Sequence, residues 1–162
     1  MEEVNQMNKE EFVQKAGWVF EHSPWVASEA WENMPFESCE HLLQTMIDIV
    51  QNAEEAKQLA LLRAHPDLGT RLQMSEVSRK EQAGAGLDQL TKEEFEEFVS
   101  LNQRYVQKFN FPFIMAVKGQ NKESILAAMK QRVHNAYDEE YSIALHEVYK
   151  IAGFRLNGIF MS

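Results

Sequence analysis

His65 is the residue of this sequence whose type and position best suit acid–base chemistry. It precedes Pro66, and because the residue before a proline is disfavoured in a helix, a helix is expected to end here. Near pH 7 an imidazole donates or accepts a proton, as a general acid or base must. A histidine at a helix end can also interact with the last carbonyl groups of that helix. From the residues alone, both interpretations stay open.

A second candidate site is the segment from Ser78 to Gln82. Ser78 and Glu81 have the spacing of a capping box, which marks the first turn of a helix and needs no function. A first helical turn also offers free N–H groups to a carboxylate or a polar ligand. Glu81 adds an acceptor beside the amide of Gln82, which both donates and accepts. This combination suits a heterocycle with alternating N–H and C=O groups, and the segment is equally well explained as a plain helix start.

Other kinds of site have weaker support. No two histidines lie three or four residues apart and the chain has one cysteine, so no zinc site is expected. The segment Gly84-Ala85-Gly86 lacks the third glycine and the lysine that phosphate-binding loops require. Cys39 lies in the first turn of a predicted helix, where the helix dipole can lower the pKa of a thiol. A packed or surface thiol is the alternative, and no catalytic partner for Cys39 can be identified.

The elements that must position these residues are predicted to be helices. Capping patterns and apolar periodicity indicate helix starts at Asn8, Ser23-Pro24, Ser38, Glu54, Ser78, Thr91, Asn121 and Asp138. The fourth helix is expected to end near Ala64 and the last near Leu156. Phe111 to Val117 has the composition of a strand, but no partner strand is evident. We therefore predict an all-α, single-domain bundle of about eight helices with an extended connector near residues 110–119.

The composition restricts the class of protein. A chain of 162 residues with 44% hydrophobic and 25% charged residues fits one globular domain. A net charge of −9 without a run of Lys or Arg argues against nucleic-acid binding. No apolar run approaches the roughly 20 residues that span a bilayer, and the N-terminus has no secretion signal. A single cysteine excludes an internal disulfide. We expect a cytoplasmic protein that binds neither nucleic acid nor membrane.

Seven short segments occur in an order that is typical of one enzyme family. They are Phe20-Glu21-His22-Ser23-Pro24-Trp25-Val26; Ala64-His65-Pro66-Asp67-Leu68-Gly69; Ser78-x-x-Glu81-Gln82 with Ala85-Gly86-Leu87; Leu101-Asn102-x-x-Tyr105; Lys108-Phe109-x-Phe111-Pro112-Phe113-Ile114; Val117-Lys118-Gly119; and Arg132, Asn135, Glu140, Ala144-Leu145-x-Glu147 with Lys150-Ile151-Ala152-x-x-Arg155-Leu156. Together they extend over essentially the whole chain. The chain resembles the 2-oxo-4-hydroxy-4-carboxy-5-ureidoimidazoline (OHCU) decarboxylases of urate degradation.

The resemblance implies the residues of an active site. The catalytic histidine and glutamate of the family fall on His65 and Glu81. The positions that the resemblance assigns to substrate binding are Pro66, Ser78, Gln82, Phe113, Ile114 and Lys118. At the last of these the family has arginine or lysine, and a lysine is a point charge rather than a planar fork. Backbone groups from Ile114 to Gly119 are expected to add contacts, because an extended connector has unpaired groups to offer.

The resemblance also implies a reaction and partners. The expected reaction is the decarboxylation of OHCU to (S)-allantoin, the last step from urate to allantoin, by a homodimer that needs neither metal nor organic cofactor. Residues 1–162 would form one decarboxylase domain, alone or within a longer fused polypeptide, and fusion or association with a urate oxidase is compatible with that role. The alternative is a non-enzymatic helical interaction domain in which His65 and Ser78 serve only at helix ends.

Overall fold

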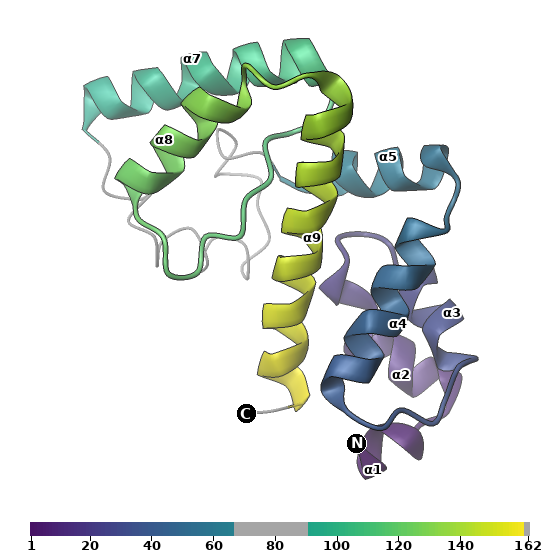
Figure 1. Ribbon diagram of the computed structural model, residues 1–162. Coiled ribbons are helices and arrows are strands. Elements are labelled where there is room, and N and C mark those ends of the chain that lie inside the picture. The colour runs from purple at the N-terminus through teal and green to yellow at the C-terminus, as the bar shows by residue number, and fades with distance from the viewer. Residues whose placement is uncertain (67–90, 161–162) are drawn as a thin grey trace. The chain divides into compact units, whose positions relative to one another are not determined.

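The computed structural model describes residues 1–66 and 91–160, and the chain divides into two compact units. The first unit comprises Met1–Ala64 with Val148–Ser162, and the second comprises His65–Glu147. Within the described ranges the chain forms eight α-helices and one 3-10 helix and no strand (Figure 1). The predicted all-α class with about eight helices is therefore confirmed. No helix in these ranges is long and apolar enough to cross a membrane.

The first unit is built from the N-terminal helices and the second half of the last helix. Its elements are α1 (Glu2–Asn5), α2 (Lys9–Ala16), η1 (Gly17–Val19), α3 (Trp25–Trp31), α4 (Cys39–Gln51), α5 (Glu55–Ala64) and the part of α9 (Tyr137–Phe160) that follows Glu147. Helix α3 packs against both α2 and α4 (Figure 1). The apolar stripes of these helices meet in a core that includes Phe12, Val26, Ala30, Leu42 and Met46, all fully buried.

Local capping starts two of these helices where the sequence predicts. The side chain of Asn8 accepts a hydrogen bond from the backbone N–H of Glu11, whose carboxylate accepts from the backbone N–H of Asn8 in return. The hydroxyl of Ser38 accepts from the backbone N–H of His41 at 3.0 Å. The predicted cap at Ser23 is wrong: its hydroxyl donates to the carbonyl of Glu21 at 2.9 Å instead, and α3 begins at Trp25 without a side-chain cap.

Close packing and a buried ion pair hold α9 in the first unit. A Cβ added at Gly153 would lie 3.2 Å from Cδ2 of Leu43, so the glycine allows a close approach to α4. Arg155 donates to the carboxylate of Glu21 at 2.9 Å, and both side chains are buried. Helix α9 begins one residue before the predicted Asp138 and continues to Phe160, four residues beyond the predicted end at Leu156.

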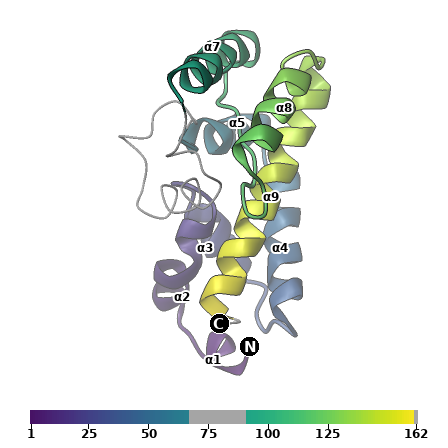
Figure 2. The ribbon, with the colours of Figure 1, turned by 90° about the vertical axis from the view of Figure 1, so that its left-hand side faces the viewer.

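The second unit contains α7 (Lys92–Phe109), α8 (Lys122–Arg132) and the first part of α9. Thr91 and Asn121 form the predicted caps, each in a capping box. Helix α7 is capped at its C-terminus by Asn110, which adopts a left-handed conformation with φ of 61°, as asparagine often does at this position. Helices α7 and α8 pack against each other (Figures 1 and 2).

An aromatic cluster forms the core of the second unit. The rings of Tyr105, Phe109, Phe111 and Phe113 are each at most 1% exposed. The ring centre of Tyr105 lies 4.7 Å from that of Phe109 and 5.3 Å from that of Phe113. Such pairs stabilise a core by about 0.5–1.5 kcal/mol each beyond the burial of their surface. The cluster joins the end of α7 to the connector that follows it.

Candidate functional site

His65 lies directly after α5, which ends at Ala64 as Pro66 predicts. Its side chain is buried, with 6% exposure, and Pro66 is half-buried. A buried imidazole is shielded from bulk water, so that its proton exchanges are governed by the groups around it. His65 is the first residue of the second unit, which also contains the connector.

The predicted extended connector is confirmed. Residues 112–117 have no helical or strand structure, and the side chains of Phe113 and Ile114 are buried, with 1% and 3% exposure. The connector ends in a turn in which the backbone N–H of Gln120 donates to the carbonyl of Val117 at 2.9 Å. Gly119 in this turn has a φ of 80°, which glycine adopts without strain. Lys118 is exposed.

A buried charged cluster lies against the connector. Arg132, at the end of α8, donates from Nε to Oε2 of Glu140 at 2.8 Å, and from Nη1 to the backbone carbonyl of Ile114 at 2.8 Å. Its guanidinium carbon lies 4.3 Å from the ring centre of Phe113, which is a cation–π distance. Arg132 is 7% exposed and Glu140 is fully buried, so the two charges neutralise each other inside the unit.

Two further side chains complete the hydrogen bonding of the Glu140 carboxylate. The phenol of Tyr105 donates to Oε2 of Glu140, and Nδ2 of Asn135 donates to Oε1 at 3.1 Å. Burial and the bond to Glu140 raise the pKa of Tyr105 above its usual value, although the nearby Arg132 acts in the opposite direction. Tyr105 therefore stays protonated at neutral pH and serves as a hydrogen-bond donor.

The connector is held at a second point by α9. Oε1 of Glu147 accepts a hydrogen bond from the backbone N–H of Ala116 at 3.1 Å. Glu147 is buried, with 8% exposure, and so is Ala116, with 7%. Buried backbone groups need partners, and the connector obtains two of them from charged side chains rather than from a neighbouring strand.

The structure places only part of the predicted site. His65, Pro66, Phe113, Ile114 and Lys118 lie in the second unit. Ser78, Glu81 and Gln82, together with the helix predicted to start at Ser78, lie outside the described residues. The cluster around Arg132 received no role from the sequence, because nothing in the residue pattern shows that a charged side chain near a helix end is buried.

Asn102 is another buried polar residue that the sequence left without a role. It is 8% exposed and lies on α7, three residues before Tyr105 and therefore on the same helical face. Among the described residues, its Oδ1 atom has no hydrogen-bond partner. Buried oxygen atoms of this kind are rare in native structures, so this atom requires an explanation.

The thiol of Cys39 is packed rather than activated. Cys39 is 5% exposed, and its Sγ donates to Oδ1 of Asn157 at 3.6 Å within the first unit. Burial raises the pKa of this thiol, and the neighbouring carboxylate of Glu40 raises it further. Of the two interpretations of this cysteine, the structure supports the packed thiol. Within residues 1–66 and 91–160, no three His, Cys, Asp or Glu side chains gather as metal ligands would.

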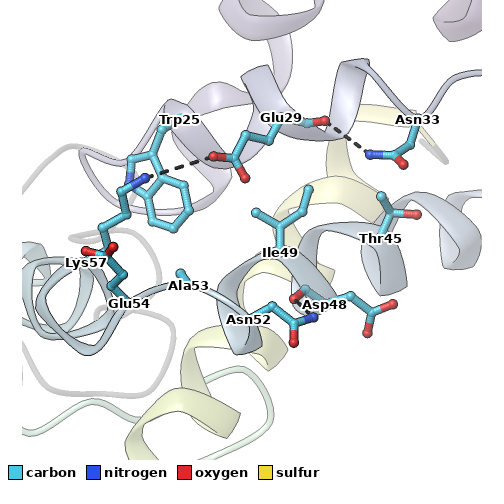
Figure 3. A pocket seen from close by; sticks show the side chains of 10 residues that line it. All are labelled: Trp25, Glu29, Asn33, Thr45, Asp48, Ile49, Asn52, Ala53, Glu54 and Lys57. Atoms are coloured by element: carbon cyan, nitrogen blue, oxygen red, sulfur yellow. Dashed lines mark hydrogen bonds and ion pairs between the residues drawn. The ribbon is translucent and has the colours of Figure 1, made fainter.

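A polar hollow of about 510 Å³ lies in the first unit between α3, α4 and the start of α5 (Figure 3). Its charged lining consists of Glu29, Asp48, Glu54 and Lys57. The ammonium group of Lys57 lies 4.9 Å from the ring centre of Trp25 and 4.0 Å from a carboxylate oxygen of Glu29. None of the predicted site residues that the structure describes lines this hollow, and its ionic side chains are exposed, so we assign it no chemistry.

Comparison with known proteins identifies the family. The sequence profile of the family described as OHCU decarboxylase matches residues 5–157. A 2-oxo-4-hydroxy-4-carboxy-5-ureidoimidazoline decarboxylase of Halalkalicoccus jeotgali is 49% identical over 156 residues, which are 96% of this chain and 89% of that protein. The protein of the same description from Haloferax volcanii is 45% identical over 162 residues, which are 100% of this chain and 96% of that protein.

Longer relatives contain the same domain as a part. A uric acid degradation bifunctional protein of a Bacillus species is 43% identical over 160 residues, which are 99% of this chain and 32% of that protein. The crystal structure of an (S)-allantoin synthase matches with a TM-score of 0.78 and 32% identity over 97% of this chain. This chain spans about half of that synthase, namely 52% of its length. The chain belongs to the OHCU decarboxylase family.

Proposed function

We propose that this protein decarboxylates 2-oxo-4-hydroxy-4-carboxy-5-ureidoimidazoline to (S)-allantoin. The observation that carries the proposal is the family match over residues 5–157, together with 49% identity to a relative of that description. Membership of an enzyme family also disfavours the alternative of a non-enzymatic helical interaction domain. The protein is accordingly a carboxy-lyase.

The chemistry of the substrate explains how side chains alone can perform this reaction. One ring carbon of OHCU carries both the carboxylate and a hydroxyl group, and it adjoins a carbon–nitrogen double bond. When the bond to the carboxylate breaks and CO₂ leaves, its electron pair forms a double bond between the two ring carbons. The electron pair of the carbon–nitrogen double bond moves onto the nitrogen, which takes up a proton from solvent, so the substrate supplies its own electron sink. The hydroxyl then loses its proton and becomes a carbonyl, while one face of the neighbouring carbon gains a proton.

In the proposed site His65 handles the proton of the substrate hydroxyl and Glu81 assists it electrostatically. The burial of His65 supports this role, because a proton transfer within a water-shielded site is directed by the residues that line it. Substrate binding is assigned to Pro66, Ser78, Gln82, Phe113, Ile114 and Lys118. The buried Phe113 and Ile114 would shield the ring, and the exposed Lys118 would attract the carboxylate.

The test is an assay that follows the chirality of the product. Urate is oxidised and hydrolysed by upstream enzymes, this protein is added, and the circular dichroism of the allantoin is recorded over time. We expect faster formation of (S)-allantoin than in spontaneous decay. Folded protein that gives no acceleration would exclude the decarboxylase function.

A single substitution tests the role of His65. His65→Asn keeps a polar side chain of similar size but cannot transfer the proton, so we expect kcat to fall by about 10²–10⁴-fold, the usual contribution of general acid–base catalysis. The far-ultraviolet circular dichroism of the variant controls for folding. A variant with wild-type rate and product chirality would show that His65 is not the catalytic residue.

We further propose that residues 1–162 act as one decarboxylase domain in a cytoplasmic homodimer. Membership of the OHCU decarboxylase family supports this proposal. Light scattering coupled to size-exclusion chromatography should give twice the mass of one chain; the mass of a single chain would contradict the dimer. The Bacillus relative is described as a bifunctional protein of uric acid degradation, which supports joint action with a second urate-degrading activity. We propose a urate oxidase, fused or associated, as that partner.

A further inference from the structure

The connector is an extended segment whose position depends on side chains from other elements of the second unit. It has no neighbouring strand within the described residues, so its backbone groups cannot be paired as in a sheet. Its two described anchors are the bond from Arg132 to the carbonyl of Ile114 and the bond from the N–H of Ala116 to Glu147. A segment that is held by a few side chains takes its exact conformation from them.

The guanidinium of Arg132 makes three different contacts at once. One edge binds the carboxylate of Glu140, a second binds the carbonyl of Ile114, and its flat face covers the ring of Phe113. The planar, delocalised fork of arginine permits this combination, whereas the ammonium group of a lysine is a point charge that cannot reproduce it. The backbone at Ile114 and the ring of Phe113 are thus fixed by one rigid group.

Glu140 prevents this guanidinium from turning. Its carboxylate is fully buried and also receives hydrogen bonds from Tyr105 and Asn135. Buried ion pairs are often no more stabilising than apolar residues of the same size, so stability alone does not explain a buried charged cluster at this place. The contacts that the cluster makes with the connector do explain it.

We propose that Arg132, held by Glu140, is a positioning residue for decarboxylation. It fixes the carbonyl of Ile114 and the ring of Phe113 in the orientation in which the connector receives the substrate. This inference rests on the proposed function, because that function assigns Phe113 and Ile114 to substrate binding. Arg132 acts through these residues and is not itself placed against the substrate.

The first test compares Arg132→Lys with a matched control on the same helix. In Arg132→Lys, the positive charge beside Glu140 is kept while the bond to Ile114 and the stacking on Phe113 are lost together. Because small misplacements of a reacting group can reduce rates by about 100-fold, we expect a loss of kcat of about 30- to 100-fold at a temperature where the variant is folded.

The control is Ile125→Ala, which removes a fully buried side chain of α8 and leaves the hydrogen bonds of Arg132 in place. Its kcat should stay within about threefold of the wild-type value while its thermal midpoint falls.

A second variant covers the case in which Arg132→Lys does not fold. The double variant Arg132→Met, Glu140→Met replaces the ion pair with apolar side chains of similar length, so no buried charge is left unpaired. We expect it to fold and to lose kcat to the same extent as Arg132→Lys. In both variants the backbone amide signals of residues 113–117 in nuclear magnetic resonance spectra should shift, whereas in Ile125→Ala they should stay in place.

The outcomes separate this inference from the proposed function. Wild-type protein that produces no (S)-allantoin contradicts the proposed function, and the amide signals then still report whether Arg132 fixes the connector. Active wild-type protein whose Arg132 variants are affected no more than Ile125→Ala overturns the inference alone. If neither Arg132 variant folds, the pair is a requirement of folding and the positioning role is wrong.

Discussion

At the scale of single residues, the second unit buries several polar side chains. Apolar residues of similar size would fill the same space, so packing alone does not explain these polar groups. Arg132, Glu140 and Glu147 are buried with their charges and have described partners. Asn102 differs, because its Oδ1 atom has no hydrogen-bond partner among the described residues. Leaving a buried acceptor unsatisfied costs about 1–3 kcal/mol, so this oxygen is expected to lower stability as it stands.

Replacing Asn102 with leucine tests this interpretation. Leucine has nearly the same shape and no polar atom, so Asn102→Leu should leave the free energy of unfolding unchanged or raise it by about 1 kcal/mol. Urea unfolding followed by circular dichroism measures the change. Asn102→Ala is the control, since it also removes the oxygen but leaves a cavity and should lower stability. A loss of more than about 1 kcal/mol in Asn102→Leu would mean that the oxygen has a partner in the folded protein.

At the scale of elements, the start of α7 shows how a local pattern contributes to stability. Glu94 accepts a hydrogen bond from the backbone N–H of Thr91 at 3.0 Å, and its carboxylate lies 2.9 Å from the ammonium group of Lys122 on α8. The bond from Thr91, followed by that from Lys122, lowers the pKa of Glu94 below its usual value of 4.5. Folding therefore favours the ionised carboxylate.

The sign of this shift gives a pH-dependence. A carboxylate whose pKa is lower in the folded state stabilises the protein above its unfolded pKa, and this contribution disappears as the pH falls through the folded pKa. We expect the difference in urea midpoint between wild-type protein and Glu94→Gln to be constant near pH 7 and to shrink below about pH 4.5. The control Glu96→Gln removes the same charge from α7 without affecting the bonds to Thr91 and Lys122. A Glu94→Gln difference that grows as the pH falls would contradict the assigned contacts.

Helix starts and ends could be predicted where their cause is local. Asn8, Thr91 and Asn121 each bond to a residue three positions later, and such spacings can be read from a sequence. The connector was predictable too, because its strand-like composition has no counterpart elsewhere in the chain. The cap at Ser23 was predicted wrongly, since its hydroxyl bonds backwards to Glu21. The burial of a polar side chain depends on partners far along the chain, so it could not be predicted. The position at which α9 ends depends on distant partners for the same reason.

The roles of the site residues depended on more than local pattern. Spacing alone left His65 as either a catalytic residue or a helix-end residue, and the structure adds that it is buried. The cluster of Arg132 and Glu140 is formed by residues eight positions apart, with the loop between α8 and α9 in between. Because the two residues lie on different helices, the periodicity of a single helix does not relate them. The contacts of Arg132 with Glu140 and the connector depend on the fold, which brings the connector, α8 and the first part of α9 together in the second unit.

At the scale of the whole molecule, the net charge opposes the binding of an anionic substrate. The chain carries a net charge of −9, and the proposed substrate carries a carboxylate. Repulsion between distant charges is screened by salt, because the Debye length falls from about 30 Å at 0.01 M to about 8 Å at 0.15 M ionic strength. In the proposed site, the exposed Lys118 would act over a shorter distance and attract the same carboxylate. The two effects have opposite signs, so salt should change the kcat/KM of the wild-type protein by less than about threefold.

Removing the local charge should expose the effect of the net charge. In Lys118→Gln only the long-range repulsion remains, so we expect kcat/KM to fall by about tenfold at 0.01 M ionic strength and to recover in part as salt is added. The control is Lys92→Gln, which makes the same change in net charge at an exposed position at the start of α7. Its salt dependence should follow that of the wild-type protein, because its charge lies outside the proposed site. Parallel salt curves for the two variants would mean that Lys118 acts only through the net charge, and its assignment to substrate binding would then be wrong.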